Sequence, residues 1–92
     1  METTYKVTVK KYNSLGRTSF VGRVTWYDNG HKTWSESTGI HRLNKFDPIK
    51  DSHKMATDRL RDSFTLRELK DNFTLNDRLS WPPELFHAVN NA

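Results

Sequence analysis

Residues 26–34 read WYDNGHKTW, and the turn in this stretch decides how the N-terminal half of the chain folds. Asp-Asn-Gly at 28–30 is typical of the tight turn of a β-hairpin. The segments on either side, SFVGRVTWY at 19–27 and HKTWSES at 31–37, contain the β-branched and aromatic residues that favour strands. The sequence therefore predicts an antiparallel hairpin centred on this turn.

The length of the turn decides where Trp34 points. A two-residue turn at Asn29 and Gly30 pairs Thr25 with Trp34 and directs the tryptophan to the outer side of the sheet. A three-residue turn, with Gly30 left-handed, pairs Val24 with Trp34 and directs it into the core. A slip of one residue moves every side chain of a strand to the opposite face. Because HKTWSES has no other apolar residue to anchor it, we expect the three-residue turn and a buried Trp34.

A third predicted strand precedes this hairpin. TYKVTVKKY at 4–12 alternates with the two-residue period of a strand that has one buried face. The apolar residues expected to face the core in the first two strands are Tyr5, Val7, Val9, Phe20, Val24 and Trp26. Gly22 interrupts this apolar row, which indicates a bulge or the close approach of another backbone.

The second half of the chain changes to helical periodicity. Asp47 followed by Pro48 predicts an N-cap and a first-turn proline. The apolar stripe of this helix is expected to contain Ile49, His53, Ala56 and Leu60. The residues after Pro48 therefore predict one amphipathic helix that packs on the sheet.

Further helix starts follow this first helix. Thr65 and Glu68 have the spacing of a capping box, and Leu66, Leu69 and Phe73 form the expected stripe. FTLREL at 64–69 is echoed by FTLNDRL from residue 73, and we interpret the echo as two successive helix starts. Trp81-Pro82-Pro83 breaks the chain before a final short helix that contains Leu85, Phe86 and Val89.

Three strands followed by helices predict an α+β fold. We expect a three-stranded antiparallel sheet from the N-terminal half, with short helices from the C-terminal half packed on one face. The chain of 92 residues is predicted to form one domain, 1–92, with Trp81 and Phe86 closing the core.

Composition narrows the class of protein. The chain has no cysteine, which excludes disulfides and cysteine metal sites and fits an intracellular protein. No apolar run approaches the roughly 20 residues of a membrane span, and METTYKVTVKKY lacks the apolar core of a signal peptide. We therefore expect a soluble, cytoplasmic protein that is too small for a deep catalytic cavity.

The net charge of +4 is concentrated in one half of the chain. Residues 1–46 carry eight Lys and Arg against three acids, whereas residues 47–92 carry seven against eight. The positive charge therefore belongs to the predicted sheet. Such an asymmetry indicates a polyanion or an acidic partner surface, and a merely soluble basic surface is the alternative.

The face of the predicted sheet turned away from the core is the candidate binding site. Cations neutralise phosphates and aromatic rings stack on unpaired bases, so that their mixture on one face is typical of nucleic-acid binding. The candidate residues are Lys6, Lys10, Tyr12, Arg23 and Tyr27, flanked by Lys11, Arg17 and Lys32. Antiparallel sheets also carry Lys and Thr on an ordinary solvated face, which is the competing interpretation.

No residue pattern indicates catalysis, a metal or a cofactor. His31, His41, His53 and His87 match no metal-ligand spacing. Ser52 and His53 beside Asp51 are what a charged helix contains by chance, and no nucleophile has a base and an orienting group. We predict that the protein is not an enzyme and takes no small-molecule substrate.

TTYKVTVKKYNSLGRTSFVGRVTWYDNG at 3–30, together with the length of the chain and its lack of cysteine, resembles phage-encoded type I-F anti-CRISPR proteins. The resemblance implies a viral, non-catalytic inhibitor in the cytoplasm of the infected bacterial host. It further implies binding to the type I-F crRNA-guided surveillance (Csy/Cascade) complex, in which target DNA is then prevented from hybridising. The implied contacts are with Cas7-type backbone subunits, with Cas5-type or Cas8-type subunits as further candidates.

The charge of this chain departs from part of that family. Some members are acidic mimics of DNA, whereas this chain has a net charge of +4. A basic inhibitor fits contact with the guide crRNA or with acidic patches between Cas subunits. No binding residue can be carried over, because these inhibitors share no diagnostic motif. Two other functions stay open: a small sheet-based domain that binds duplex DNA directly, and a small enzyme, which the missing catalytic residues disfavour.

Overall fold

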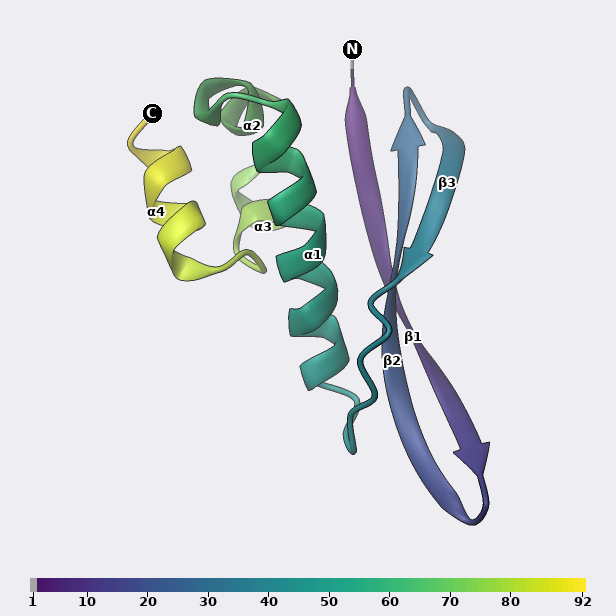
Figure 1. Ribbon diagram of the computed structural model, residues 1–92. Coiled ribbons are helices and arrows are strands. Elements are labelled where there is room, and N and C mark those ends of the chain that lie inside the picture. Colours follow the sequence, from purple (N-terminus) through teal and green to yellow (C-terminus); the bar gives the residue numbers. More distant parts are fainter. Residues whose placement is uncertain (1) are drawn as a thin grey trace.

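The computed structural model describes residues 2–92 and shows an antiparallel sheet with helices on one side (Figure 1). The elements are β1 (Thr3–Ser14), β2 (Arg17–Asp28), β3 (His31–Ser37), α1 (Asp47–Ser63), α2 (Leu66–Asn72), α3 (Leu75–Arg78) and α4 (Pro83–Asn90). The strand order is β1-β2-β3, and α1 packs on β1 and β2. The predicted α+β fold is confirmed.

The turn between β2 and β3 is shorter than expected. Asp28 pairs with His31, so that Asn29 and Gly30 alone form the turn, with φ of 50° and 83°. Two left-handed residues in succession match the twist of the flanking strands, and asparagine tolerates this conformation better than most residues. The prediction of a three-residue turn is therefore wrong.

A bulge just beyond the turn sets the position of Trp34. Thr33 is unpaired in the ladder, and its hydroxyl donates to the Trp26 carbonyl at 3.3 Å. Trp34 therefore pairs with Trp26 and lies on the helix side of the sheet. It is nevertheless 50% exposed, because α1 packs mainly on β1 and β2. The expected side is correct, but the prediction that Trp34 is buried is wrong.

β1 and β2 form a hairpin that extends beyond the helices. They pair along their whole length, whereas β3 pairs with β2 only from Arg23 onward. The far end of the hairpin, residues 10–21, is called the ribbon below. It ends in a turn at Leu15 and Gly16 and projects past the start of α1 (Figure 1). The ribbon accounts for much of the long dimension of the molecule, whose extents are 48 × 28 × 21 Å.

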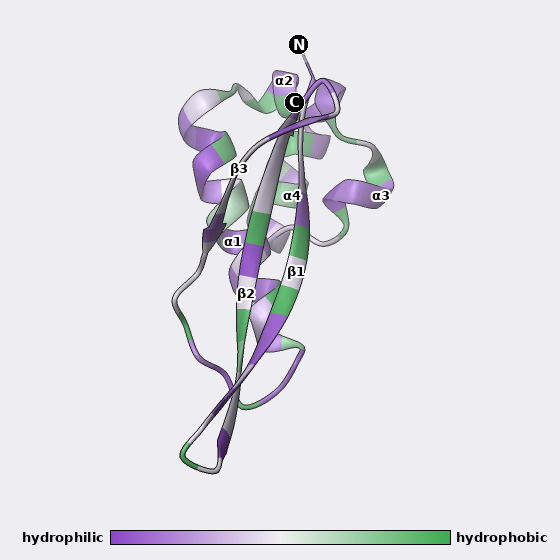
Figure 2. Ribbon diagram, turned by 90° about the vertical axis from the view of Figure 1, so that its right-hand side faces the viewer, coloured by the Kyte–Doolittle hydropathy of each residue, from purple (hydrophilic) through white to green (hydrophobic). Residues whose placement is uncertain are grey.

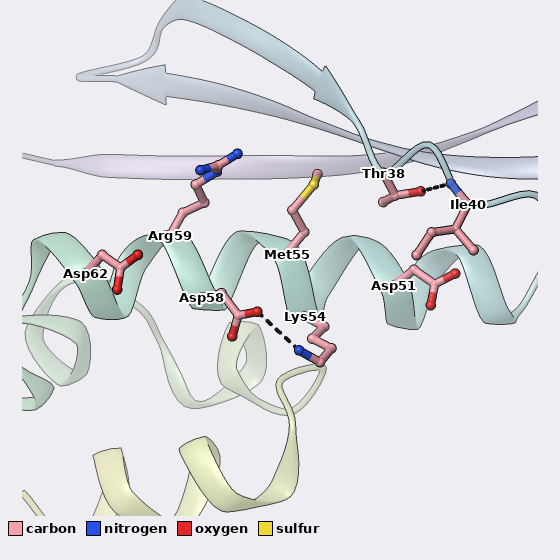
Figure 3. Close-up of a pocket in the computed structure, with 8 residues that line it drawn as sticks. All are labelled: Thr38, Ile40, Asp51, Lys54, Met55, Asp58, Arg59 and Asp62. Atoms are coloured by element: carbon pink, nitrogen blue, oxygen red, sulfur yellow. Dashed lines mark hydrogen bonds and ion pairs between the residues drawn. The ribbon is translucent and has the colours of Figure 1, made fainter.

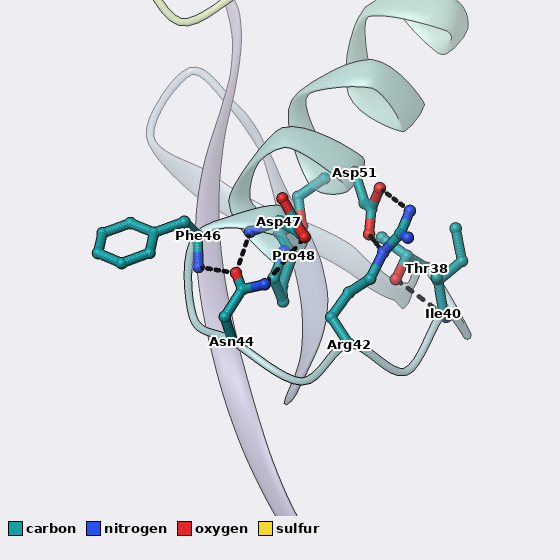
Figure 4. Close-up of polar contacts among 9 residues, drawn as sticks. Thr38, Ile40, Arg42, Asn44, Phe46, Asp47, Pro48 and Asp51 are labelled. Atoms are coloured by element: carbon teal, nitrogen blue, oxygen red, sulfur yellow. Dashed lines mark hydrogen bonds and ion pairs between the residues drawn. The ribbon is translucent and has the colours of Figure 1, made fainter. Parts of the chain in front are cut away.

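The segment at 38–46 returns along β2 where β3 has ended. Phe20 and Arg42 exchange backbone hydrogen bonds of 2.8 and 2.9 Å, which form an isolated antiparallel bridge. The Arg42 guanidinium then donates two hydrogen bonds, of 2.8 and 2.9 Å, to the Asp51 carboxylate on α1 (Figure 4). This bidentate pair joins the edge of the sheet to the helix.

The start of α1 differs by one residue from the prediction. Phe46 is the N-cap residue, and Asp47 is the first residue of the helix. Asn44 replaces the predicted cap, since its side-chain oxygen accepts the backbone N–H groups of Phe46 and Asp47 at 2.9 Å (Figure 4). Pro48 falls in the first turn, as expected, where its missing N–H costs nothing.

Gly22 allows α1 to approach β2. A Cβ atom at this residue would lie 2.0 Å from the Ser52 hydroxyl oxygen and 2.3 Å from the Pro48 carbonyl oxygen. These distances are far shorter than any van der Waals contact, so that only glycine fits without a shift of the helix. The predicted close approach of another backbone is confirmed.

The core lies between the helix side of the sheet and the helices. Its buried members are Val24, Trp26, Ala56, Leu60, Leu69, Phe73, Trp81, Leu85 and Val89. Tyr5 and Val7 pack against this cluster, and Trp81 closes it as predicted. Phe86 was predicted to close it too, but it is only half-buried and lies outside the cluster. The buried stripe of α1 is shifted from the predicted one, because Pro48 and Ser52 are buried while Ile49 is 41% exposed.

The two predicted helix starts after α1 are both confirmed. At α2 the Thr65 hydroxyl accepts the Glu68 N–H at 3.2 Å, and the Glu68 carboxylate accepts the Thr65 N–H at 3.1 Å. The same box recurs at α3 with Thr74 and Asp77. Of the helices within residues 2–92, none combines the length and the apolar character needed to cross a membrane.

Candidate binding face

The candidate face is the side of the sheet that no helix covers, and Figure 2 looks onto it with the helices behind. Strand alternation and the cross-strand register place one set of side chains there. We call this surface the outer face; its members are Lys6, Thr8, Lys10, Tyr12, Ser19, Val21, Arg23, Thr25, Tyr27, Lys32 and Ser35. The structure therefore brings together all five residues predicted as the centre of the site.

Two lysine ammonium groups of the outer face lie over tyrosine rings. Lys6 Nζ lies 5.4 Å from the ring centroid of Tyr27, across the two strands. Lys10 Nζ lies 5.1 Å from the ring centroid of Tyr12, on the same strand. Such cation–π contacts contribute about 0.5–1 kcal/mol at exposed sites. They keep each ammonium group next to an aromatic ring, so that charge and stacking surface are presented together.

Arg23 occupies the middle of the outer face. Its partner across β1 is Thr8, and its Nη1 donates to the Ser35 hydroxyl on β3 at 3.0 Å. The side chain is half-buried, and the hydrogen bond ties it to the third strand. A guanidinium held in this way keeps its other N–H groups for a carboxylate or phosphate.

No carboxylate lies on the outer face within the three strands. The strands contain only two acids, Asp28 and Glu36, and the register places both on the helix side. Glu36 accepts the Trp26 Nε1–H at 3.2 Å and pairs with Arg59 Nη2 at 2.8 Å. Hydrogen bonding to Glu36 raises the pKa of Arg59 above its ordinary value. Glu36 is therefore neutralised by α1, Asp28 accepts from the Thr3 hydroxyl at 3.0 Å, and the outer face is left uniformly basic.

The three flanking residues do not all belong to the outer face. Lys11 pairs with Phe20 and shares the opposite side of the hairpin with it. Arg17 lies next to the ribbon turn, opposite Ser14. Lys32 pairs with Tyr27 on the outer face, since the bulge lies beyond it. Lys11 was expected to flank this face, and strand alternation directs it away instead.

One neighbour of the outer face could not be predicted from strand alternation. His41, from the segment at 38–46, lies at its edge, where its Nδ1 is 2.8 Å from the Ser19 hydroxyl. Its ring centroid is 5.6 Å from that of Tyr12. No local pattern around His41 indicates a contact with a strand more than twenty residues earlier. The contact follows from the path of the segment at 38–46 along β2.

The helix side carries a shallow pocket of about 360 Å³ between α1 and the segment after β3 (Figure 3). Two of its three acids pair with cations: Asp58 with Lys54 at 3.2 Å, and Asp51 with Arg42 at 2.8 Å. No hydroxyl, thiol or histidine nucleophile with an attached base lines the pocket. Among residues 2–92, no three His, Asp or Glu side chains gather at a position that could hold a metal ion.

Comparisons with known proteins add no assignment. No protein-family model, no curated protein and no solved structure matches the chain.

Proposed function

We propose that this protein is a non-catalytic inhibitor of the type I-F crRNA-guided surveillance complex and that it binds through the outer face, touching the guide RNA. The observation that supports the proposal is the uniform charge of that face: Lys6, Lys10, Arg23 and Lys32 are interleaved with tyrosines, and no acid lies among them. The second support is the resemblance of residues 3–30 to type I-F inhibitors.

The chemistry of the outer face fits an RNA strand held on a protein surface. Ammonium and guanidinium groups neutralise phosphates, and the counterions released on binding provide much of the affinity. Tyr12 is 37% exposed at the base of the ribbon, which leaves ring surface for an unpaired base. Base stacking on aromatic side chains contributes about 1–3 kcal/mol per base.

Inhibition would require only that the protein occupy the surface of the guide strand. A basic domain seated over the guide strand blocks the phosphates and base edges that target DNA must reach, and it needs no bond to be made or broken. The partners in this proposal are the guide RNA and the Cas7-type backbone subunits, with Cas5-type or Cas8-type subunits at the ends. The place of action is the cytoplasm of the infected host.

The test is a gel shift of labelled target duplex. The protein alone should leave the duplex unshifted, whereas addition of the protein to a purified type I-F surveillance complex should abolish the shift that the complex causes. If the protein shifts the duplex by itself and leaves binding by the complex intact, the inhibitor proposal falls.

A pair of charge reversals identifies the binding surface. Lys10→Glu with Arg23→Glu should restore the shift by the complex, because both changes repel phosphates on the outer face. The matched control is Lys54→Glu with Arg67→Glu, which makes the same change in net charge at helix side chains that are 71% and 74% exposed. The control should inhibit like the parent, and circular dichroism should show that both variants are folded. Equal inhibition by both would mean that the outer face is not the binding surface.

A second candidate function is direct binding of duplex DNA. The observation in its favour is the ribbon, since a two-stranded β-ribbon fits the major groove of B-DNA. This function predicts a shift of duplex by the protein alone that weakens steeply with salt. The gel shift without the surveillance complex separates the two functions.

A further inference from the structure

The tip of the ribbon has an unusual residue in a strained conformation. Leu15 has φ of 50°, in the left-handed region where a leucine side chain is crowded against its own backbone, and Gly16 follows with φ of 75°. The β2–β3 hairpin has a turn of the same kind, with Asn29 at φ of 50° before Gly30. The chain therefore uses the favoured asparagine in one turn and an unfavoured leucine at the same position of the other.

Packing does not account for this leucine. The Leu15 side chain is 99% exposed, the highest value among the large apolar residues that the structure describes as exposed. It lies on the rim of a hollow of about 650 Å³ beside the ribbon, which Tyr12, His41 and the 89% exposed Leu43 also line. Leu15 thus carries both backbone strain and exposed apolar surface without stabilising the fold, as functional positions do.

The charge around Leu15 points to the chemistry of its partner. Lys10, Lys11 and Arg17 are the charged residues of the ribbon, and no acid occurs between residues 10 and 21. Because Lys10 and Lys11 project from opposite sides of the hairpin, cations flank the tip on both sides. An apolar tip with a cation on each side of the hairpin behind it matches nucleic acid, in which phosphates lie outside and stacked bases lie inside.

We infer that Leu15 is a wedge that inserts between stacked bases of the nucleic acid held by the outer face. Lys10, Lys11 and Arg17 contact the phosphates on either side, and the leucine side chain replaces one base-stacking contact. Apolar wedges of this kind offset the cost of unstacking by bringing more protein surface against the strand. The inference rests on the nucleic-acid contact of the proposed function and adds the way in which that contact is made.

The test uses base unstacking as its readout. The full chain is titrated into an RNA strand that carries 2-aminopurine at several positions and, separately, into a DNA duplex of the same sequence with the same label. Insertion of Leu15 should raise 2-aminopurine fluorescence, and the arm that responds identifies the nucleic acid. Leu15→Asn should remove the rise and weaken binding about tenfold. It should also raise Tm by about 4 °C, because asparagine relieves the strain.

Two further variants complete the design. Leu15→Met keeps an apolar side chain at the tip and should keep most of the fluorescence rise. Leu79→Asn makes the same side-chain change at a 64% exposed position between α3 and α4, away from the ribbon, and it should behave like the parent. A Leu15→Asn variant that binds and unstacks as well as the parent would overturn the wedge.

The other outcomes separate the wedge from the function on which it rests. If Lys10→Glu with Arg23→Glu abolishes nucleic-acid binding but the parent causes no fluorescence rise, the wedge is wrong and the outer face stands. If the parent binds neither RNA nor DNA, nucleic-acid contact itself falls. If Leu15→Asn loses only its affinity for the surveillance complex, with nucleic-acid binding unchanged, the tip docks in a protein pocket and the wedge is overturned.

Discussion

Three polar groups meet at the Tyr5 hydroxyl at the edge of the core. The hydroxyl accepts the Trp81 Nε1–H at 2.9 Å and lies 2.8 Å from His53 Nδ1. A hydroxyl that accepts from Trp81 keeps its own proton to donate to Nδ1, and this direction corresponds to a neutral His53 with its proton on Nε2. Burial lowers the pKa of His53 and raises the pKa of Tyr5 to about 12, so that both groups stay uncharged near neutral pH.

The lowered pKa of His53 predicts a dependence of stability on pH. Between the folded pKa and the unfolded value of about 6.5, the unfolded chain binds more protons than the folded one. The free energy of unfolding should therefore be constant above about pH 6.5, fall as the pH drops through this window, and level off below the folded pKa. Urea unfolding from about pH 7.5 to pH 5 measures it.

His53→Gln is the control for this prediction. Glutamine can accept the Tyr5 hydrogen bond but does not titrate. The variant should therefore lose the part of the pH dependence that the parent shows between the folded and the unfolded pKa of His53. Identical pH profiles for parent and variant would assign the dependence to other groups.

At the residue scale, the sequence predicts which side of a strand or helix a residue faces better than it predicts which residues it contacts. Alternation placed Tyr5 toward the core, and its ring does lie there. Its hydrogen-bond partner Trp81 comes 76 residues later, and no periodicity links residues so far apart. Val21 lies on the outer face with Lys10, yet it is only 3% exposed, so that the side of a strand does not by itself determine exposure.

At the scale of elements, the seating of α1 on β2 depends on one missing side chain. Gly22 lies beneath the first turns of the helix, where Pro48 and Ser52 are buried against the strand. The Ser52 hydroxyl donates to the Pro48 carbonyl at 2.7 Å and so leaves no unpaired polar group at the contact. Strand and helix backbones can meet this closely only because the strand has no Cβ there.

Gly22→Ala should therefore push α1 away from the sheet. The added methyl group overlaps the Pro48 carbonyl, which is backbone and cannot rotate away. We expect a loss of about 1–3 kcal/mol in the free energy of unfolding, as for other overpacked cores, measured by urea denaturation. Thr25→Ala, on the outer face of the same strand, should cost less. An alanine at residue 22 without cost would contradict the close seating of the helix.

The elements themselves were largely predictable, and their junctions were not. The Thr65 and Thr74 capping boxes are local patterns, and both helices begin where these patterns place them. The Thr33 bulge combines a two-residue turn at Asn29 and Gly30 with a Trp34 that lies on the helix side of the sheet. Neither of the two registers that the turn alone allows contains it, because each assumes an unbroken ladder beyond the turn.

At the scale of the whole molecule, charge is divided between two sides. The acids of the strands face α1, where Glu36 pairs with Arg59, and the cations of the outer face have no acid beside them. A domain arranged in this way presents one sign of charge to a partner on its sheet side.

Affinity for nucleic acid should therefore depend steeply on salt. For an RNA strand, each phosphate contact adds about 0.7 to the slope of log affinity against log salt concentration. Lys6→Gln should lower this slope by about 0.7, whereas Lys54→Gln on α1 should leave it unchanged. Fluorescence anisotropy over a range of salt concentrations measures both. A slope that responds equally to the two variants would remove the outer face as the phosphate-binding surface.

The class of fold and the basic side of the sheet both follow from the sequence, because period-two alternation separates apolar from cationic residues along β1 and β2. Lys11 shows where this reasoning stops. Its neighbours Lys10 and Tyr12 belong to the outer face, and the sequence alone predicts that Lys11 flanks them. The register with Phe20 directs it to the opposite side.

The hydrogen bond between Tyr5 and Trp81 also bears on how the chain is made. Of the strand pairs, β1–β2 can form early, but the core stays open until Trp81 has left the ribosome, 76 residues after Tyr5. At bacterial or eukaryotic elongation rates this interval lasts roughly 4–15 s. In the first part of that time, before α1 has been made, the apolar side of the new hairpin has no helix to cover it. The core therefore cannot be completed before Trp81 has been made, and a nascent chain stalled short of Trp81 would expose apolar surface that chaperones bind.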